Sequence, residues 1–178
     1  LSGRHVAIFG RRAMPRFGHV IVVGMGQVGL RLAEELKQLG IAVVGIEQDP
    51  HARTLQIARS FGIPVLIGDG ASKAAVHATG VKGAIALVAA SSAERDNIAV
   101  AVSALAANPQ LRVVIRAGSD DAIDETRSLF QIGAVVDVNG LTATFIAASL
   151  GEKPPYAVIA TPGGNLAVEE SGDTVVKV

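Results

Sequence analysis

The chain has 178 residues, of which 49% are hydrophobic and 3% aromatic, with 20 glycines and no cysteine. This length and composition predict one packed domain with a sizeable core, and they exclude a disordered chain, a disulfide-stabilised fold and a cysteine-based metal site. Lys plus Arg and Asp plus Glu both number 16, so no overall charge favours nucleic acid, and the few aromatic residues argue against a protein that stacks single-stranded bases.

The first 17 residues form the expected basic N-terminal arm or linker. Their four arginines precede the first acidic residue of the chain, Glu34, and are Arg4, Arg11, Arg12 and Arg16. A solvated arm and a segment lying near an anionic membrane surface are the two main interpretations. Nucleic acid comes third, because nothing downstream extends the basic patch. The chain begins with Leu1 and not with Met, which is compatible with a fragment of a longer protein.

Two segments near the start of the chain have similar sequences. Residues 5–15 and residues 19–29 both begin with His-Val, continue as an apolar run and reach a glycine. The first copy has no second glycine for the approach of a phosphate, and Pro15 soon interrupts any helix. We therefore expect only the second copy to form a binding site, and the first to be an extended stretch that pairs as an edge strand.

From residue 19 onward, β-branched apolar runs alternate with amphipathic helical patterns. The expected strands are residues 19–24, 41–47, 63–68, 83–90, 111–116 and 133–138, and the expected helices are residues 27–39, 50–61, 71–79, 93–107, 120–131 and 141–150. This alternation predicts an α/β fold, a Rossmann-like doubly wound parallel sheet with strand order 3-2-1-4-5-6. We expect that domain at residues 18–150. Residues 151–178 should form a short C-terminal β appendage of two strands, or the start of a second lobe.

A G-x-G-x-x-G motif lies between the first strand and the first helix of this alternation. Gly24 is expected to permit the tight turn, Gly26 to let the backbone approach a pyrophosphate, and Gly29 to let the helix pack on the sheet. Unpaired N–H groups at the start of the helix would face the phosphates. Glycines that serve only the turn and the packing are the alternative. The candidate cofactor-binding residues here are Gly24, Met25, Gly26, Gln27, Val28 and Gly29.

Glu47 ends the second predicted strand, close to the spacing of about 20 residues beyond the motif that dinucleotide-binding folds show. Its carboxylate is expected to accept hydrogen bonds from the adenosine ribose hydroxyls. Its charge would repel a 2′-phosphate, and the neighbouring candidates Gln48 and Asp49 supply no arginine, so NAD(H) is favoured over NADP(H). An exposed strand-end carboxylate is the alternative for Glu47. Asp49 precedes Pro50 and is also a candidate cap for the next helix.

Further candidates lie at the carboxyl ends of the third to fifth strands, where ligands bind in open α/β sheets. They are Gly68, Asp69, Gly70, Ala89, Ser91 and Arg116. Asp69 could contact adenine or ribose, or either Asp69 or Ser72 could cap the next helix. Arg116 could reach a phosphate or pair with a carboxylate. The small residues after the fourth strand leave room for a cofactor, although small residues are common in any turn.

Catalytic groups are missing from these patterns. None of the four histidines is expected at the ligand edge, and no Ser-His-Asp pattern, His-rich metal spacing or P-loop lysine occurs. The predicted domain also leaves no room for a substrate domain. A bound nucleotide without evident chemistry favours a sensor over an enzyme. An NAD-dependent oxidoreductase, or its cofactor-binding half, and a scaffold with an empty cleft are the alternatives.

Several stretches taken together resemble the RCK (regulator of K⁺ conductance) domain, also called the TrkA N-terminal domain, over residues 19–150. They are the glycine motif, the acidic end of the second strand, Gly-Asp after the third, ALVAASSAERDN at residues 86–97 and VVIRA at residues 113–117. The resemblance implies a cytoplasmic regulatory domain at the inner face of the cell membrane. Such a domain serves the membrane subunit of a potassium channel or transporter, which could be the same polypeptide.

The resemblance also implies a homodimer or gating ring, and a ligand that is NAD(H) or one of AMP, ADP and ATP. The family's ligand positions match Gly24, Gly26, Gly29, Glu47 and Asp69. The predicted helix at residues 141–150 falls where the family places a crossover helix used in dimerisation. Two departures are visible: Gln27 lies where many members carry a basic residue, and the usual second lobe is nearly absent.

Overall fold

The computed structural model describes residues 7–9, 14–117, 133–150, 155–161, 164–168 and 175–177. The helix expected at residues 120–131 lies outside this described part, and so do three of the four arginines of the N-terminal arm. Within the described part, no helix combines the length and the apolar character that crossing a membrane requires.

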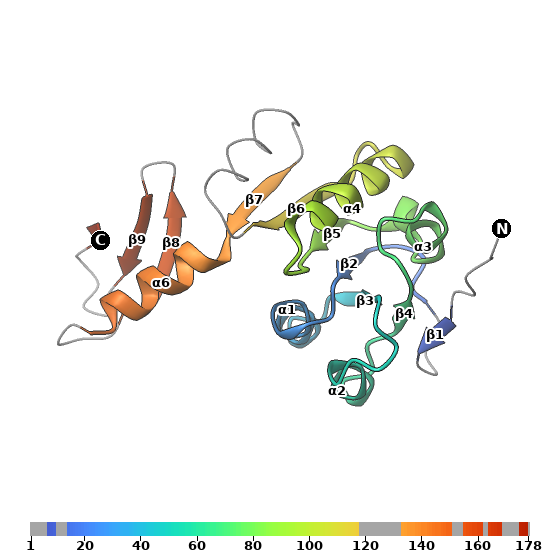
Figure 1. The fold of residues 1–178 in the computed structure, drawn as a ribbon, viewed down its shortest axis with the longest axis horizontal. Coiled ribbons are helices and arrows are strands. Elements are labelled where there is room, and N and C mark those ends of the chain that lie inside the picture. Colours follow the sequence, from blue (N-terminus) through green and yellow to red (C-terminus); the bar gives the residue numbers. More distant parts are fainter. Residues whose placement is uncertain are drawn as a thin grey trace.

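A seven-stranded sheet organises the larger part of the molecule, in the order β1-β4-β3-β2-β5-β6-β7 (Figure 1). Its six parallel strands are β2 (His19–Val23), β3 (Ala42–Glu47), β4 (Val65–Ile67), β5 (Ala86–Ala89), β6 (Arg112–Ala117) and β7 (Ala134–Asp137). This order confirms the predicted doubly wound arrangement. The short strand β1 (Ala7–Phe9) pairs antiparallel with β4 at the edge, which confirms the expectation for the first His-Val copy.

Helices cover both faces of this sheet (Figure 1). On one face lie α1 (Gln27–Gln38) and α2 (Thr54–Ser60); on the other lie α3 (Lys73–Ala78), the 3₁₀ turn η1 (Val81–Gly83) and α4 (Glu94–Ala107). Each face has its own apolar cluster, because successive side chains of a strand point to opposite sides. Thus Val20 and Val22 of β2 pack with Leu30 and Ala33 of α1, whereas Ile21 packs in the cluster that contains residues of α3 and α4.

Two helices, α2 and the last helix, begin three or four residues away from the predicted start, in each case beside an aspartate that caps a turn. Asp49 accepts a hydrogen bond from the His51 N–H at 2.8 Å, so the segment after β3 is a turn and α2 begins only at Thr54. His51 therefore lies in that turn and not in a helix. Asp137 accepts a hydrogen bond from the Gly140 N–H, also at 2.8 Å, so the last helix begins directly after β7 and earlier than predicted.

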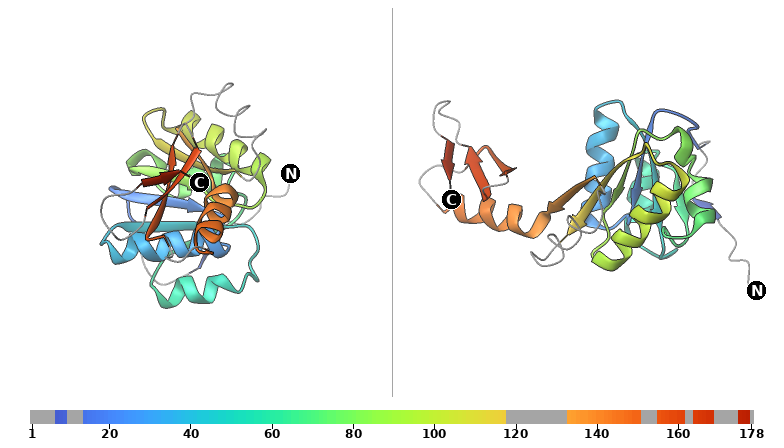
Figure 2. Two further views of the ribbon diagram at one scale, coloured as in Figure 1. Left: turned by 90° about the vertical axis from the view of Figure 1, so that its left-hand side faces the viewer. Right: turned by 90° about the horizontal axis from the view of Figure 1, so that it is seen from above.

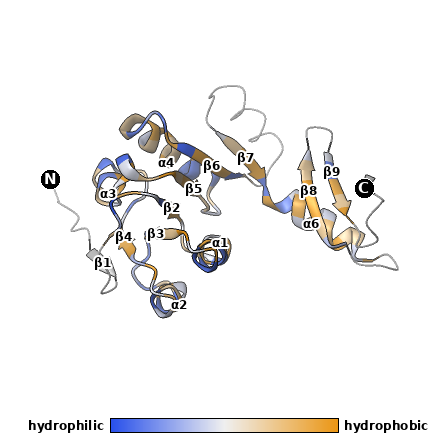
Figure 3. Ribbon diagram, turned by 180° about the vertical axis from the view of Figure 1, so that it is seen from behind, coloured by the Kyte–Doolittle hydropathy of each residue, from blue (hydrophilic) through white to orange (hydrophobic). Residues whose placement is uncertain are grey.

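The C-terminal part is a helix with a small sheet on it. The helix is α6 (Val138–Ala148), and the antiparallel strands β8 (Ala157–Thr161), β9 (Gly164–Val168) and β10 (Val175–Lys177) have the order β10-β9-β8. The predicted appendage thus has three strands and not two. The helix α6 packs on β8 and β9 and extends away from the large sheet (Figure 2). Apolar residues run along these strands and much of α6 (Figure 3), and Phe145 and Ile146 of α6 are exposed.

Candidate functional site

The glycine motif forms a tight turn between β2 and α1. Gly24 has a φ of +86°, a left-handed conformation that favours glycine, and an added Cβ would lie 2.8 Å from the Ser91 backbone nitrogen. The Gly24 N–H donates to the Ile46 carbonyl at 2.9 Å, which ties the turn to the neighbouring strand β3. The predicted role of Gly24 in the turn is therefore confirmed.

The other two motif glycines differ in what surrounds them. A Cβ on Gly29 would collide with the Gly24 carbonyl oxygen, so this glycine allows α1 to pack against the turn, as predicted. A Cβ on Gly26, the N-cap of α1, would meet nothing within 4 Å. The backbone at Gly26 is thus open from outside, and the approach of a pyrophosphate there stays a prediction.

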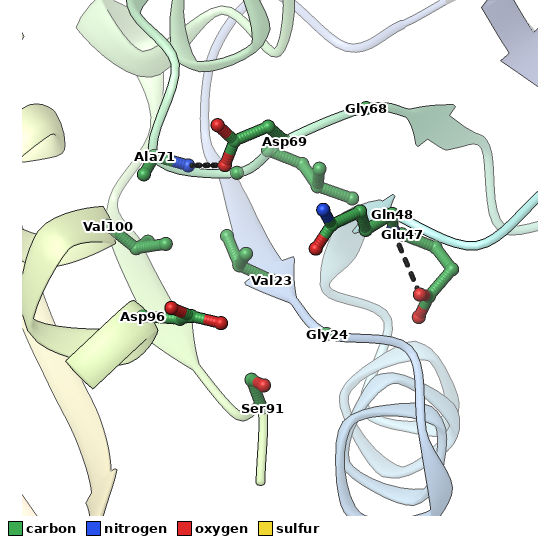
Figure 4. Close-up of a pocket in the computed structure, with 12 residues that line it drawn as sticks. Val23, Gly24, Glu47, Gln48, Gly68, Asp69, Ala71, Ser91, Asp96 and Val100 are labelled. Carbon is green, nitrogen blue, oxygen red and sulfur yellow. Dashed lines mark hydrogen bonds between the residues drawn. The ribbon is translucent and has the colours of Figure 1, made fainter. Parts of the chain in front are cut away.

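A cavity of about 310 Å³ lies at the carboxyl ends of β2, β3 and β4, beside the start of α4 (Figure 4). It is lined by Val23, Gly24, Ile46, Glu47, Gln48, Gly68, Asp69, Gly70, Ala71, Ser91, Asp96 and Val100. Three of these described residues carry carboxylates and none carries a cationic side chain. The cavity therefore suits hydrogen-bond donors and disfavours phosphate groups.

A second cavity, of about 400 Å³, adjoins the first and shares Gly24, Glu47 and Ser91 with it. Its other lining residues are Gly26, Gln27, Val28, Ala90, Ser92 and Arg116. Among these described residues, Arg116 carries the one cationic side chain. The second cavity thus combines the open backbone at the start of α1 with a guanidinium group, two features that suit an anion.

Glu47 lies between the two cavities and is already hydrogen-bonded. One carboxylate oxygen accepts from the Met25 N–H at 2.8 Å, and the other accepts from the N–H groups of Gln48 and Asp49 at 2.9 and 3.0 Å. A carboxylate offers about four acceptor positions, so these bonds leave roughly one for a ligand. Glu47 is therefore not merely an exposed strand-end carboxylate: it also fixes the glycine-rich turn against the end of β3.

The loop after β4 uses both of its predicted capping residues. Asp69 accepts from the Ala71 N–H at 2.9 Å, which shapes the loop, and Ser72 accepts from the Ala75 N–H at 3.2 Å as the N-cap of α3. The cap of the helix is thus Ser72, while the Asp69 carboxylate lies at the cavity (Figure 4).

Asn97 joins the ends of β5 and β6, a role that the sequence interpretation missed. This side chain is fully buried; its amide NH₂ donates to the carbonyls of Ser91 and Arg116, both at 2.9 Å, and its amide oxygen accepts from the Ser91 N–H at 3.0 Å. The Arg116 guanidinium in turn donates to the Ala90 carbonyl at 3.3 Å. Both strand ends at the second cavity are therefore held together by side chains.

Four predicted site residues line neither cavity. Met25 and Ala89 are fully buried in the core, Gly29 packs against the turn, and Asp49 is exposed and caps the turn before α2. The lining residues that the sequence interpretation did not place beside the cofactor are Val23, Ile46, Ala71, Ser92, Asp96 and Val100. Asp96 lies in the first turn of α4, where a carboxylate suits the helix dipole, and its side chain also lies at the first cavity (Figure 4).

No described histidine lines either cavity. His19 is buried at the start of β2, at the other end of the sheet, and its Nε2–H donates to the Thr79 carbonyl at 2.7 Å. His51 lies in the turn before α2 and His77 lies in α3. The described part of the cavities thus offers no imidazole for acid–base chemistry.

Strand order reverses between β2 and β5, and both cavities open at that point of the carboxyl edge. This arrangement places the chain in the Rossmann-like class of α/β proteins, whose ligands bind at such a switch point. The chain belongs to the TrkA-N domain family, which matches residues 20–137. The resemblance and the fold class predicted from the sequence are thereby confirmed.

Two curated relatives of this chain are named for potassium transport. It is 25% identical over 107 residues to Potassium channel protein 1 of Methanocaldococcus jannaschii, a match that covers 60% of this chain and 32% of the relative. It is 34% identical over 83 residues to the Trk system potassium uptake protein TrkA of Streptomyces coelicolor, covering 47% of this chain and 37% of the relative. The chain thus spans about a third of these relatives. These names agree with the predicted regulatory domain of a potassium channel or transporter.

Solved structures share the fold. The TrkA-N domain of the inner membrane protein ybaL from Escherichia coli has a TM-score of 0.65 and 26% identity, over 76% of this chain and 98% of that one. The Kef CTD of Shewanella denitrificans in AMP-bound form has a TM-score of 0.62 and 23% identity, over 74% of this chain and 80% of that one. The GsuK channel bound to NAD has a TM-score of 0.60 and 18% identity, over 85% of this chain and 25% of that one.

Proposed function

We propose that this chain is a ligand-sensing regulatory domain of a potassium channel or transporter, with a nucleotide bound across the two adjoining cavities. The observation that carries the proposal is the division of the site into an acidic half and a half lined by the glycine-rich turn. Asp69 and Glu47 suit the amino group of adenine and a ribose hydroxyl. The backbone of residues 26–28 and the Arg116 guanidinium suit phosphate.

Glu47 has two tasks in this proposal. Its bond to the Met25 N–H fixes the glycine-rich turn against the end of β3, and its remaining acceptor position takes a ribose hydroxyl. A 2′-phosphate in that place would meet three carboxylates without a cation among the described lining residues. The site therefore favours NAD(H) over NADP(H).

NAD(H) is the proposed ligand, and AMP, ADP and ATP are the alternatives. NAD(H) would occupy both cavities, whereas an adenine mononucleotide would place its base and ribose in the first and its phosphates toward the second. Two structural neighbours support nucleotides of these kinds, since one is bound to NAD and the other to AMP. Ligand binding would act on the membrane protein by favouring one arrangement of the assembled domains.

The proposed assembly is a homodimer or gating ring at the inner, cytoplasmic face of the cell membrane. Exposed apolar side chains on α6, including Phe145 and Ile146, support a contact between copies. We propose residues 1–17 as an arm or linker, residues 18–150 as the nucleotide-binding domain, and residues 151–178 as an appendage or the start of a second lobe. The packing of α6 on β8 and β9 makes this helix the connection between the last two parts.

Calorimetric titration tests the proposal with NADH, NAD⁺, NADPH, ADP and ATP. We expect NADH or NAD⁺ to bind more tightly than NADPH, and the absence of binding by all five would overturn the proposal. Incubation of the chain with NADH and a panel of carbonyl compounds separates a sensor from an oxidoreductase. Substrate-dependent oxidation of NADH would favour the enzyme.

Replacement of Glu47 by alanine is expected to weaken binding of NADH by 10-fold or more, because a hydrogen bond to a charged group contributes roughly 1.5–3 kcal/mol. The matched control is Asp49→Ala, which removes a neighbouring carboxylate that lines neither cavity. It should bind NADH like the wild type. Thermal unfolding of both variants without ligand shows how much of the effect comes from the lost bond to the Met25 N–H. Unchanged affinity in Glu47→Ala would show that the site is assigned wrongly.

A further inference from the structure

Exposed apolar side chains gather at the end of the large sheet where the parallel strands start, opposite the cavities. Phe17 lies just before β2, Leu39 before β3 and Ile85 before β5, and they are 80%, 74% and 46% exposed. These three strands are neighbours in the order β3-β2-β5, so the three side chains come from adjacent loops. Single exposed apolar residues are ordinary, but three in adjacent loops at one end of a sheet indicate a surface that binds a partner.

Basic side chains lie at the same end of the sheet. Arg16 precedes Phe17, Lys82 lies in η1 before β5, and Arg112 is the first residue of β6; all three are exposed. None of the three lies in an α-helix, so the helix dipole does not account for them. Among the described residues of this end, 14–18, 37–41, 59–64, 77–86 and 107–112, no aspartate or glutamate occurs.

We call this surface the strand-start face and define it by six residues: Arg16, Phe17, Leu39, Lys82, Ile85 and Arg112. The opposite end carries the carboxylates of Glu47, Asp69 and Asp96 at the first cavity. The whole chain has equal numbers of acidic and basic residues, so net charge does not draw it to an anionic surface. The uneven distribution instead orients the molecule, with the strand-start face toward negative charge and the carboxylates away from it.

We propose that the strand-start face docks on an anionic membrane surface. Each exposed basic side chain near such a surface strengthens the attraction of the protein to the anionic lipids. Exposed aromatic and aliphatic side chains insert among the lipid headgroups. A bilayer interface accepts Phe17 and Leu39 without a matching pocket, whereas an acidic protein partner would have to provide one for each. Docking by this face leaves the cavities directed away from the lipid and does not depend on whether a nucleotide is bound.

Sedimentation of the full chain with phospholipid vesicles tests this docking. Vesicles of phosphatidylcholine with about one third phosphatidylglycerol should bind the chain at low salt, and pure phosphatidylcholine should not. The triple variant R16Q/K82Q/R112Q should lower the partition coefficient roughly 100-fold, since each lost base costs about five-fold near an anionic surface. The double variant F17S/L39S should lower it as well, with the net charge unchanged.

The matched control is R53Q/K73Q/R95Q, which removes three exposed basic side chains near the cavity end, none of which lines a cavity. It lowers the net charge equally and should still bind the anionic vesicles. Equal loss in both triple variants, or no binding of the wild type to anionic vesicles, overturns the proposal. Retention on immobilised polyglutamate without vesicle binding would favour an acidic protein partner instead. NADH titration of the triple variants, expected to be unchanged, separates this result from the proposed nucleotide site.

Discussion

Replacement of Gly29 by alanine is expected to lower the free energy of unfolding by roughly 3 kcal/mol, the upper range for overpacking of a tight contact. The added Cβ would collide with the Gly24 carbonyl oxygen, which is backbone and cannot rotate away. To accommodate the methyl group, either the turn or the start of α1 has to shift. Urea unfolding at equilibrium measures the effect as a lower midpoint with an unchanged slope.

Gly26→Ala is the matched control, because the same methyl group there meets nothing within 4 Å. The φ of Gly26 is −67°, which alanine adopts readily, so the cost should stay within about 1 kcal/mol for a poorer N-cap. Its methyl group would nevertheless stand where we expect phosphate, and affinity for NADH should fall at least 10-fold. Wild-type stability in Gly29→Ala would contradict the packing role, and wild-type affinity in Gly26→Ala would contradict the phosphate position.

Replacement of Asn97 by leucine should cost about as much stability and also weaken nucleotide binding. The side chain is fully buried and makes three hydrogen bonds, to both backbone groups of Ser91 and to the Arg116 carbonyl. Leucine fills a similar volume but leaves these groups without partners, and each unsatisfied buried group costs about 1–3 kcal/mol. We expect a total loss of roughly 3 kcal/mol in urea unfolding. NADH affinity should fall as well, since the freed strand ends line the second cavity.

Asn108→Leu provides the comparison at the other end of the sheet. Asn108 also donates through its amide to a carbonyl, that of Val81 at 3.1 Å, and accepts from the Gln110 N–H, but it is only partly buried. Water can replace its partners, so we expect a loss of about 1 kcal/mol and unchanged affinity for NADH. If Asn97→Leu also left the affinity unchanged, the join between β5 and β6 would be structural only.

Local patterns in the sequence were enough to predict the sheet and the glycine turn. The roles of Gly24 and Gly29 depend on neighbours within a few residues, and the alternation of strands and helices restricts the strand order to a few arrangements. Asn97 is different, because its partners lie at the ends of two separate strands. Only the packing of α4 against β5 and β6 brings them within hydrogen-bond distance.

The alternatives that the sequence left open depended on side-chain rotamers. Arg116 lines the second cavity and also bonds to the Ala90 carbonyl, which neither of the two sequence-based readings included. Asp69 and Ser72 both bond to backbone N–H groups of this segment: Asp69 shapes the loop, whereas Ser72 caps the helix α3. The early start of α6 could have been predicted from the sequence. Asp137 is a preferred N-cap residue, and an N-cap side chain accepts from the N–H group three residues later, here that of Gly140.

The junction at Asp137 has a mechanical consequence. This residue ends β7 and is also the N-cap of α6, so no loop separates the large sheet from the helix that carries β8 and β9. The 11 residues of α6 make an arm about 16 Å long. A rotation of about 10° at Asp137 would move the far end of that arm by about 3 Å, given the rise of the helix. A small change in the direction of β7 would thus be enlarged before it reaches the three-stranded sheet.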